Sequence, residues 1–318
     1  MVKVIIKLSL FVLLFASTTA MHSMHRLARV AKSPAAKVAL GVALGITSTA
    51  QVYKPTITYG IPKTAHEPVT VASHGFGARK EHAFGYHVDS GNQGAFIEGV
   101  LHAFDYDDVD SPLKTNLGQK ADIVILDENA KKYEDCDLFG WSRGASAIGN
   151  YAGTHELKNV RAIILESPFD DLKNVVKKKT GFASSASVVG WATNHDPNGV
   201  QPVKVADKVD KNIPILIYCC KNDTVVDAGL SIEYYKVLRR SGHNKAYLLV
   251  VDRGAHANII NGKDGEIVRN VVHAFKKAHN RPHNPEWAKE GQERYKQCQP
   301  AFDEKPKKQS SWFSSLSS

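Results

Sequence analysis

A serine between two glycines is the first feature of this sequence that could do chemistry. Residues 140–144 read Gly-Trp-Ser-Arg-Gly, after an apolar run and before an alanine-rich stretch. A nucleophilic serine on a strained turn needs this order of strand, sharp turn and helix. Side chains at Gly140 and Gly144 would collide with the neighbouring strand and helix. The pattern predicts Ser142 as a nucleophile, and a glycine-rich turn without catalysis is the alternative.

Two later loops supply residues that could activate this serine. One apolar run ends shortly before Asp223, and another ends shortly before His256. Both loops follow carboxyl ends of predicted strands, where ligands meet an open α/β sheet. The order Ser, Asp, His along the chain is the one expected on such a sheet. We predict His256 as general base and Asp223 as the acid that orients it, with Asp170 as the second candidate for the acid.

A glycine loop upstream could stabilise negative charge. The segment His74-Gly75-Phe76-Gly77 directly follows a predicted strand. Backbone N–H groups in such a loop can point at an oxyanion that forms in the transition state. We predict the amides of Phe76 and Arg143 as the pair of donors. His74 is interpreted as a brace for the loop through hydrogen bonding rather than as a reacting group.

The elements that must position these residues alternate between short apolar runs and longer helical stretches. This alternation predicts a mostly parallel central sheet with helices on both faces, an α/β fold. The expected strands are residues 56–59, 69–73, 100–104, 137–140, 162–166, 215–218 and 247–251, and the expected helices are residues 120–132, 145–152, 230–240 and 265–279.

The domain plan places one catalytic domain at residues 51–280. Residues 170–212 interrupt the alternation of strands and helices and predict a lid insertion. Its apolar residues suggest an apolar acyl site, with simple packing of the lid as the other interpretation. A polar tail that we expect to be disordered follows at residues 281–318. Before the domain come a signal peptide at residues 1–20 and an N-terminal segment at residues 21–50.

The first twenty residues are typical of an export signal. A basic start precedes the apolar run at residues 8–16 and a small-residue cleavage site ending at Ala20. A second apolar run, residues 38–46, permits a start at Met24 instead. Neither run reaches the roughly 18–20 apolar residues of a spanning helix. We expect a secreted or periplasmic protein, with an uncleaved N-terminal membrane anchor as the alternative.

At this point the chain resembles a known family. It is similar to α/β-hydrolases over residues 56–279, and most closely to their Bem46-like branch. The resemblance is carried by Glu-Ser-Pro-Phe at residues 166–169, Ile-Pro-Ile-Leu-Ile-Tyr at residues 213–218 and Gly-Ala-His-Ala-Asn at residues 254–258. It implies the α/β-hydrolase fold and a serine hydrolase that cleaves esters, thioesters or amides through an acyl-enzyme, without a metal or organic cofactor. An acyltransferase on the same triad and a non-catalytic binding protein are the alternatives.

One departure from the family pattern is an acidic stretch. Where the family has a glycine-rich turn, Asp105, Asp107, Asp108 and Asp110 follow the third predicted strand. Such acidity could alter the choice of substrate. A calcium loop is a weak interpretation, because the glycine and the terminal glutamate of an EF-hand are missing.

Charge and cysteine content limit the partners. The formal net charge is +9 at pH 7, but the lysines are scattered and no aromatic residues are interleaved with them, so no nucleic-acid partner is expected. The expected partner is a small-molecule or acyl-bearing substrate, with a membrane surface as a further possibility and the oligomeric state left open. The four cysteines are too few for a disulfide scaffold, although export would permit one bridge. They are Cys136, Cys219, Cys220 and Cys298.

Overall fold

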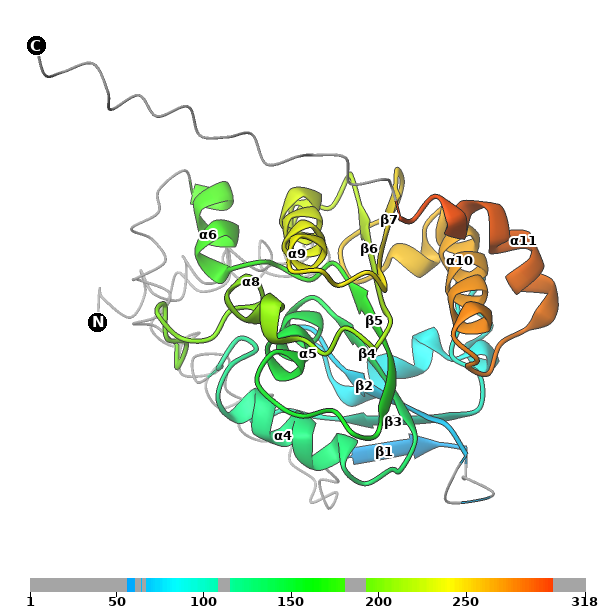
Figure 1. Cartoon of the computed structure of the whole chain (residues 1–318), viewed down its shortest axis with the longest axis horizontal. Coiled ribbons are helices and arrows are strands. Elements are labelled where there is room, and N and C mark those ends of the chain that lie inside the picture. Colours follow the sequence, from blue (N-terminus) through cyan, green and yellow to red (C-terminus); the bar gives the residue numbers. More distant parts are fainter. Residues whose placement is uncertain (1–55, 61–63, 65–66, 108–114, 181–192, 300–318) are drawn as a thin grey trace, which may run out of the picture.

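A seven-stranded sheet organises the part of the chain that the structure describes, and its strand order is β1-β3-β2-β4-β5-β6-β7 (Figure 1). The computed structural model describes residues 56–60, 64, 67–107, 115–180 and 193–299. Strand β1 is antiparallel to β3, and every other neighbouring pair is parallel. The strands are β1 (Thr56–Tyr59), β2 (Val69–Ser73), β3 (Val100–Phe104), β4 (Cys136–Trp141), β5 (Val160–Glu166), β6 (Ile215–Cys220) and β7 (Ala246–Val251).

The predicted fold class is confirmed, and each predicted strand is present with its ends shifted by at most two residues. The apolar runs form strands that are buried on both faces. In β5, Ile163 and Leu165 contribute to the core on one face of the sheet, and Ile164 to the core on the other. This alternation explains why the run is apolar throughout, since successive side chains point to opposite faces.

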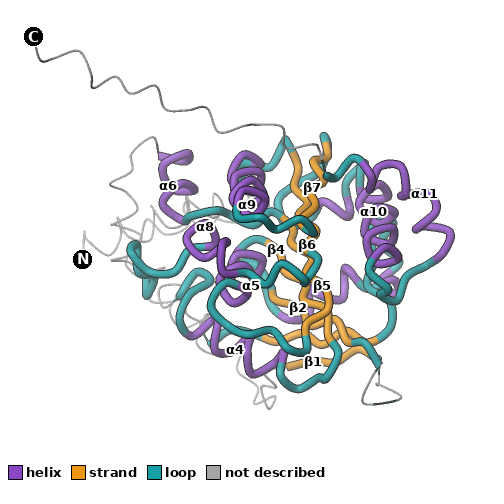
Figure 2. Tube along the Cα trace, in the orientation of Figure 1, coloured by secondary structure: helices purple, strands orange, loops and turns teal. Residues whose placement is uncertain are grey.

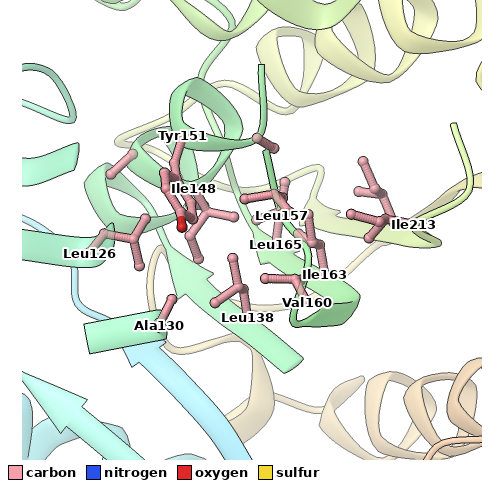
Figure 3. Packing of buried hydrophobic residues seen from close by; sticks show 14 of the residues in the cluster. Leu126, Ala130, Leu138, Ile148, Tyr151, Leu157, Val160, Ile163, Leu165 and Ile213 are labelled. Carbon is pink, nitrogen blue, oxygen red and sulfur yellow. The ribbon is translucent and has the colours of Figure 1, made fainter. Parts of the chain in front are cut away.

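Helices cover both faces of the sheet, as Figure 2 shows. On one face, Leu126, Ile148 and Tyr151 from the helices pack on Leu138 and Leu165 from the strands (Figure 3). The helices of this face are α4 (Ala121–Ala130), α5 (Arg143–Ala152), α8 (Pro202–Val205) and α9 (Ala228–Arg240), and those of the other face are α10 (Gly265–Ala278) and α11 (Pro285–Lys296), with the 3-10 helices η1 (Lys80–Tyr86) and η5 (Ile259–Asn261). The remaining short turns are η2 (Val88–Ser90) and η4 (Ala206–Lys208).

The predicted lid is only partly within the described residues. It begins with helix α6 (Leu172–Thr180). On α6, Leu172 and Val176 are buried in an apolar cluster that also contains Phe169 and Leu230. The apolar residues that suggested an acyl site lie outside the described residues, at Phe182, Val188, Val189 and Trp191.

The prediction of a disordered tail from residue 281 is wrong for residues 281–299. Helix α11 begins at Pro285, where the Asn284 side chain accepts hydrogen bonds from the amides of Glu286 and Trp287. Proline fits the first turn of a helix because it lacks a backbone N–H that would have no partner there. Tyr295 of this helix is buried and belongs to the hydrophobic core on this face of the sheet. The polar composition that suggested disorder therefore belongs to the exposed face of a docked helix.

Two further predictions concern the N-terminal segments and the cysteines. The predicted signal peptide and N-terminal segment lie outside the described residues, as do residues 300–318. Among the helices that the structure describes, none combines the length and the apolar character needed to span a bilayer. All four cysteines are buried free thiols, and Cys219 and Cys220 lie in β6 as expected.

Arg281→Ala is expected to lower the free energy of unfolding by about 3–5 kcal/mol, because it leaves a buried carboxylate without its partner. The Arg281 Nε donates to Asp137 at 2.7 Å, and burial raises the pKa of Asp137 against the opposing effect of this arginine. Urea unfolding followed by circular dichroism measures the change. As the control, Arg240→Ala breaks an exposed pair with Glu233 and should cost less than about 1 kcal/mol. Equal small losses would contradict the anchoring role of Arg281.

Candidate active site

The predicted nucleophile occupies a strained turn between β4 and α5. Ser142 has φ 55° and ψ −119°, a left-handed conformation that costs energy for a residue with a side chain. Its amide donates to the carbonyl oxygen of Glu166 at 2.9 Å, which continues the pairing of β4 with β5. Helix α5 begins at the next residue, so the serine side chain lies at the amino end of this helix.

The two flanking glycines are required by close backbone contacts. A Cβ atom at Gly144 would lie 2.0 Å from the carbonyl oxygen of Ser73 in β2. A Cβ atom at Gly140 would lie 2.7 Å from the carbonyl carbon of Gly144. Both distances are far below a van der Waals contact, so only glycine allows α5 to approach the sheet this closely. A side chain at Gly140 or Gly144 would therefore collide with neighbouring backbone, as the motif predicts.

The structure brings Ser142, His256 and Asp223 together in one hydrogen-bonded chain. The Oγ of Ser142 lies 2.8 Å from Nε2 of His256, and Nδ1 of the same ring lies 2.8 Å from Oδ2 of Asp223. If Nδ1 carries the proton that faces the carboxylate, Nε2 is left to accept from the serine hydroxyl. The His256 side chain is 13% exposed and the Asp223 side chain is 0% exposed. A substrate can thus reach the ring while the carboxylate stays dry.

The carboxylate of Asp223 is held by its own loop. Its Oδ1 accepts hydrogen bonds from the amides of Val225 at 2.8 Å and Val226 at 2.9 Å. The second candidate for the acid, Asp170, is engaged elsewhere, because its oxygens accept from the Asp171 amide at 2.6 Å and from the Asn174 side chain at 2.8 Å. Burial raises the pKa of Asp170 to about 6. The structure brings Asp223, and not Asp170, to the imidazole.

The predicted oxyanion loop passes directly against the nucleophile. A Cβ atom at Gly75 would lie 3.3 Å from the Cβ of Ser142 and 3.0 Å from the Trp141 ring, so a larger residue here would require these side chains to shift by a few tenths of an ångström. Nδ1 of His74 bonds to the Gly75 carbonyl oxygen at 2.7 Å. Gly77 has φ +70°, the left-handed region that favours glycine. The loop therefore approaches Ser142 at Gly75, the residue before Phe76.

A buried ion pair behind this loop was not predicted. The Lys80 side chain donates to Asp105 at 2.7 Å, and the Lys80 amide donates to the same carboxylate at 2.7 Å. Nε2 of His74 lies 3.5 Å from Asp105. Asp105 thus supports the loop and is not open to substrate or calcium, whereas Asp107 of the same acidic stretch is exposed. Asp108 and Asp110 lie outside the described residues, and no cluster of metal ligands occurs among the residues that the structure describes.

A second buried ion pair fixes the first residue of α5. The Arg143 guanidinium donates to both oxygens of Asp122, at 2.8 Å and 2.6 Å. It also lies over the ring of Tyr106, 4.2 Å from the ring centre. The hydroxyl of Tyr106 contacts Ser73, which precedes the glycine loop. Through Tyr106, the side chain of Arg143 is therefore linked to Ser73, the last residue of β2. Strand β2 leads into the glycine loop that carries Phe76, the other predicted donor.

A cavity of about 520 Å³ opens beside His256. This volume is within the range of small-molecule binding sites. Four aromatic rings contribute to its wall, and the polar lining residues include one carboxylate and, among the described residues that line it, no lysine or arginine. The rings are those of Phe76, Phe84, Tyr86 and Trp141, and the polar residues are Glu81, His82, Asn258 and Asn261.

Glu166 is the site residue that the sequence reasoning left without a role. It ends β5, is fully buried, and accepts hydrogen bonds from the hydroxyls of Tyr86 at 2.7 Å and Tyr218 at 2.9 Å. A glutamate at the end of an otherwise apolar run was the available signal, because a carboxylate is seldom buried without a purpose.

One family matches the centre of the chain. Residues 124–281, which include Ser142, Asp223 and His256, match the prolyl oligopeptidase family, peptidase S9. A search of curated protein sequences finds no match.

Several solved structures share the fold. Est1E from Butyrivibrio proteoclasticus, with ferulic acid bound, has a TM-score of 0.53 at 17% identity, over 71% of this chain and 95% of that one. MGS-MChE2, an α/β-hydrolase enzyme from a sediment metagenome of the Mar Chica lagoon, has a TM-score of 0.50 at 18% identity over the same shares, 71% and 95%. The acylaminoacyl peptidase of Pyrococcus horikoshii has a TM-score of 0.50 at 16% identity over 71% of this chain. This chain spans only 38% of the length of that peptidase.

The comparisons name no Bem46-like protein, so that narrower resemblance stays a prediction. The solved structures establish the α/β-hydrolase fold, and the family match supplies the class of enzyme. The chain is a serine hydrolase of the α/β-hydrolase type, and its residues 124–281 match the peptidase S9 family.

Proposed function

We propose that this protein cleaves a carboxylic ester, thioester or amide through an acyl-enzyme on a triad of Ser142, His256 and Asp223. The observation that carries the proposal is the pair of 2.8 Å contacts on either side of the His256 ring. This geometry allows a base to take the hydroxyl proton while a carboxylate orients the ring.

In the acylation step, Nε2 of His256 takes the proton from the Ser142 hydroxyl as Oγ attacks the substrate carbonyl carbon. The bond from that carbon to the leaving group then breaks, and the imidazolium returns its proton to the leaving oxygen, sulfur or nitrogen. Water attacks the acyl-enzyme in the same manner, releases the acid and restores the serine. Asp223 stabilises the imidazolium in both steps.

The oxyanion would be held by the amides of Phe76 and Arg143. Two observations support this assignment. The glycine loop lies against Ser142, and Arg143 is the first residue of α5, whose amino end carries a partial positive charge. One well-placed donor of this kind contributes about 2.7–4 kcal/mol to the transition state.

The cavity beside His256 suggests the substrate class. Four aromatic rings in its wall favour an apolar or aromatic group on the substrate. Its one carboxylate among the described lining residues is Glu81, which is half exposed and paired with Lys80 at 2.9 Å. These lining residues include no lysine or arginine that could receive an anionic group. We propose a neutral aromatic or aliphatic substituent, on either the acyl or the leaving side.

Ser142→Ala is expected to abolish labelling by a fluorophosphonate probe and to lower kcat/KM by about 10⁴-fold or more, because the nucleophile is lost. Hydrolysis of 4-nitrophenyl acetate and gel fluorescence measure the two effects. Labelling of the alanine variant at the rate of the wild type would contradict Ser142 as the nucleophile, and a wild type that is not labelled at all would favour a binding protein. Product analysis with an added alcohol acceptor separates hydrolysis from acyl transfer.

Asp223→Asn should lower kcat by up to about 10⁴-fold, since the amide no longer selects the required tautomer of His256. Asp170→Asn is the matched control, because it replaces a buried carboxyl that bonds to α6, and kcat should stay within about threefold. Burial raises the pKa of Asp170 from 3.8 to about 6, so the unfolded chain ionises first and stability falls as pH rises from about 4 to about 6. Asp170→Asn should therefore weaken the fall in melting temperature between about pH 4 and 6. Reversed effects on kcat would make Asp170 the acid.

A carboxylate added to the substrate group that enters the cavity is expected to lower kcat/KM by about tenfold, because Glu81 repels it and no lysine or arginine is among the described residues that line the cavity. Two series of esters, one with the charge on the acyl part and one with it on the alcohol, show which part enters. Glu81→Gln should narrow the difference between charged and neutral esters. If neither series depends on charge, the cavity does not contact the substrate.

A further inference from the structure

Glu166 stands where the supports of the nucleophile and of the base meet. Its backbone carbonyl accepts the Ser142 amide at 2.9 Å. Its side-chain Oε1 accepts the amide of Ile259, the first residue of η5, at 3.3 Å. One residue at the end of β5 therefore contacts both the turn of Ser142 and the segment that follows His256.

The segment between His256 and Ile259 is short and strongly bent. Ala257 has φ 53°, and the Asn258 amide donates to the Ala255 carbonyl at 3.1 Å. With only two residues between them, a displacement of Ile259 moves the backbone of His256. The imidazole must stay within hydrogen-bond distance of two partners on different loops, so it tolerates little movement.

The other end of the same loop has its own carboxylate anchor. Asp264, which precedes α10, accepts the amides of Asp252 at 3.0 Å and Arg253 at 2.8 Å. The loop that carries His256 is thus held by Asp264 before the histidine and by Glu166 after it. Asp264 lies in direct contact with an arginine, whereas Glu166 relies on two phenols and one amide.

The fold alone gives little reason for a carboxylate at this position. Glu166, the last residue of β5, is completely buried between its sheet neighbours Trp141 in β4 and Tyr218 in β6. Burial raises the pKa of Glu166, against the opposing effect of the hydrogen bonds from Tyr86, Tyr218 and Ile259. A raised carboxyl pKa means that the charged form costs stability in the folded state. Such a cost is typical of residues kept for function.

We propose that Glu166 is a positioning residue that, through the amide of Ile259, holds the loop of His256 so that the imidazole stays between Ser142 and Asp223. Tyr86 and Tyr218 fix the carboxyl for this task by donating to Oε2, which leaves Oε1 for the amide. The inference rests on the proposed triad and adds a fourth residue that contacts no substrate.

The test compares Glu166→Gln with Glu166→Met, two unbranched side chains of similar length. Glutamine keeps an acceptor for the Ile259 amide, and the tyrosine hydroxyls can turn to accept from its NH2 group. Its kcat for 4-nitrophenyl acetate should stay within about threefold of wild type. Methionine offers no such acceptor, and its kcat should fall about 10- to 100-fold with KM nearly unchanged, because the loss lies in the alignment of the base. Equal kcat in the methionine variant and wild type would overturn the proposal.

A control separates positioning from general destabilisation. Asp137→Asn alters another buried carboxyl, which is paired with Arg281. Asp137 lies near the amino end of β4, whereas the loop of His256 lies at the carboxyl ends of the strands. It should lower the melting temperature without lowering kcat of the folded protein. A similar loss of kcat in this variant and in Glu166→Met would attribute both to instability and would refute a positioning role.

A spectroscopic readout distinguishes failure of this proposal from failure of the proposed triad. The proton between His256 and Asp223 should give a low-field proton NMR signal that is absent in His256→Ala. We expect this signal in wild type, Glu166→Gln and Asp137→Asn, and its loss or broadening in Glu166→Met. The signal reports where the imidazole lies whether or not Ser142 proves to be the nucleophile. An unchanged signal in Glu166→Met refutes the role of Glu166 in either case.

Discussion

The close approach of helix α5 to strand β2 is the constraint on which the rest of the site depends. With 2.0 Å between a virtual Cβ at Gly144 and the carbonyl oxygen of Ser73, the helix rests on the sheet with no room for a side chain. That contact sets the height of Ser142 above the strand ends, and hence where a base must lie to reach its hydroxyl. The loops after β6 and β7 meet this requirement because parallel strands end at the same edge of the sheet.

Charged groups around this edge are buried in pairs or held by several donors. Asp122 accepts hydrogen bonds from Arg143 at 2.8 Å and 2.6 Å, and Asp105 accepts one from the Lys80 side chain at 2.7 Å. Each pair fixes a segment that contributes one of the proposed oxyanion donors. A buried pair adds little net stability, because desolvation offsets most of the attraction. Its value here is geometric, because each pair restricts the segment that it holds to one arrangement.

Local patterns predicted most of the fold and the three residues of the proposed triad. The strands were predictable because each is a short run that must be apolar on both faces, and the turn at Ser142 because its glycines are needed within five residues of sequence. Glu166 and Arg143 were different. Their side chains bind residues distant in sequence, Tyr86 and Tyr218 in one case and Asp122 in the other, and no local spacing encodes such a partner. Helix α11 was missed for a related reason, because its order comes from docking onto α10 rather than from an apolar sequence.

The ring of Tyr86 belongs to two structures at once. Its face forms part of the cavity wall beside His256, and its hydroxyl donates to the carboxyl of Glu166. A ligand that contacts the Tyr86 ring therefore also affects the hydrogen bond between Tyr86 and Glu166 at the end of β5. By thermodynamic reciprocity, any free energy that the ligand adds to or takes from that bond is returned in its own affinity. Ligand binding in the cavity and the strength of the hydrogen bond between Tyr86 and Glu166 are thus coupled.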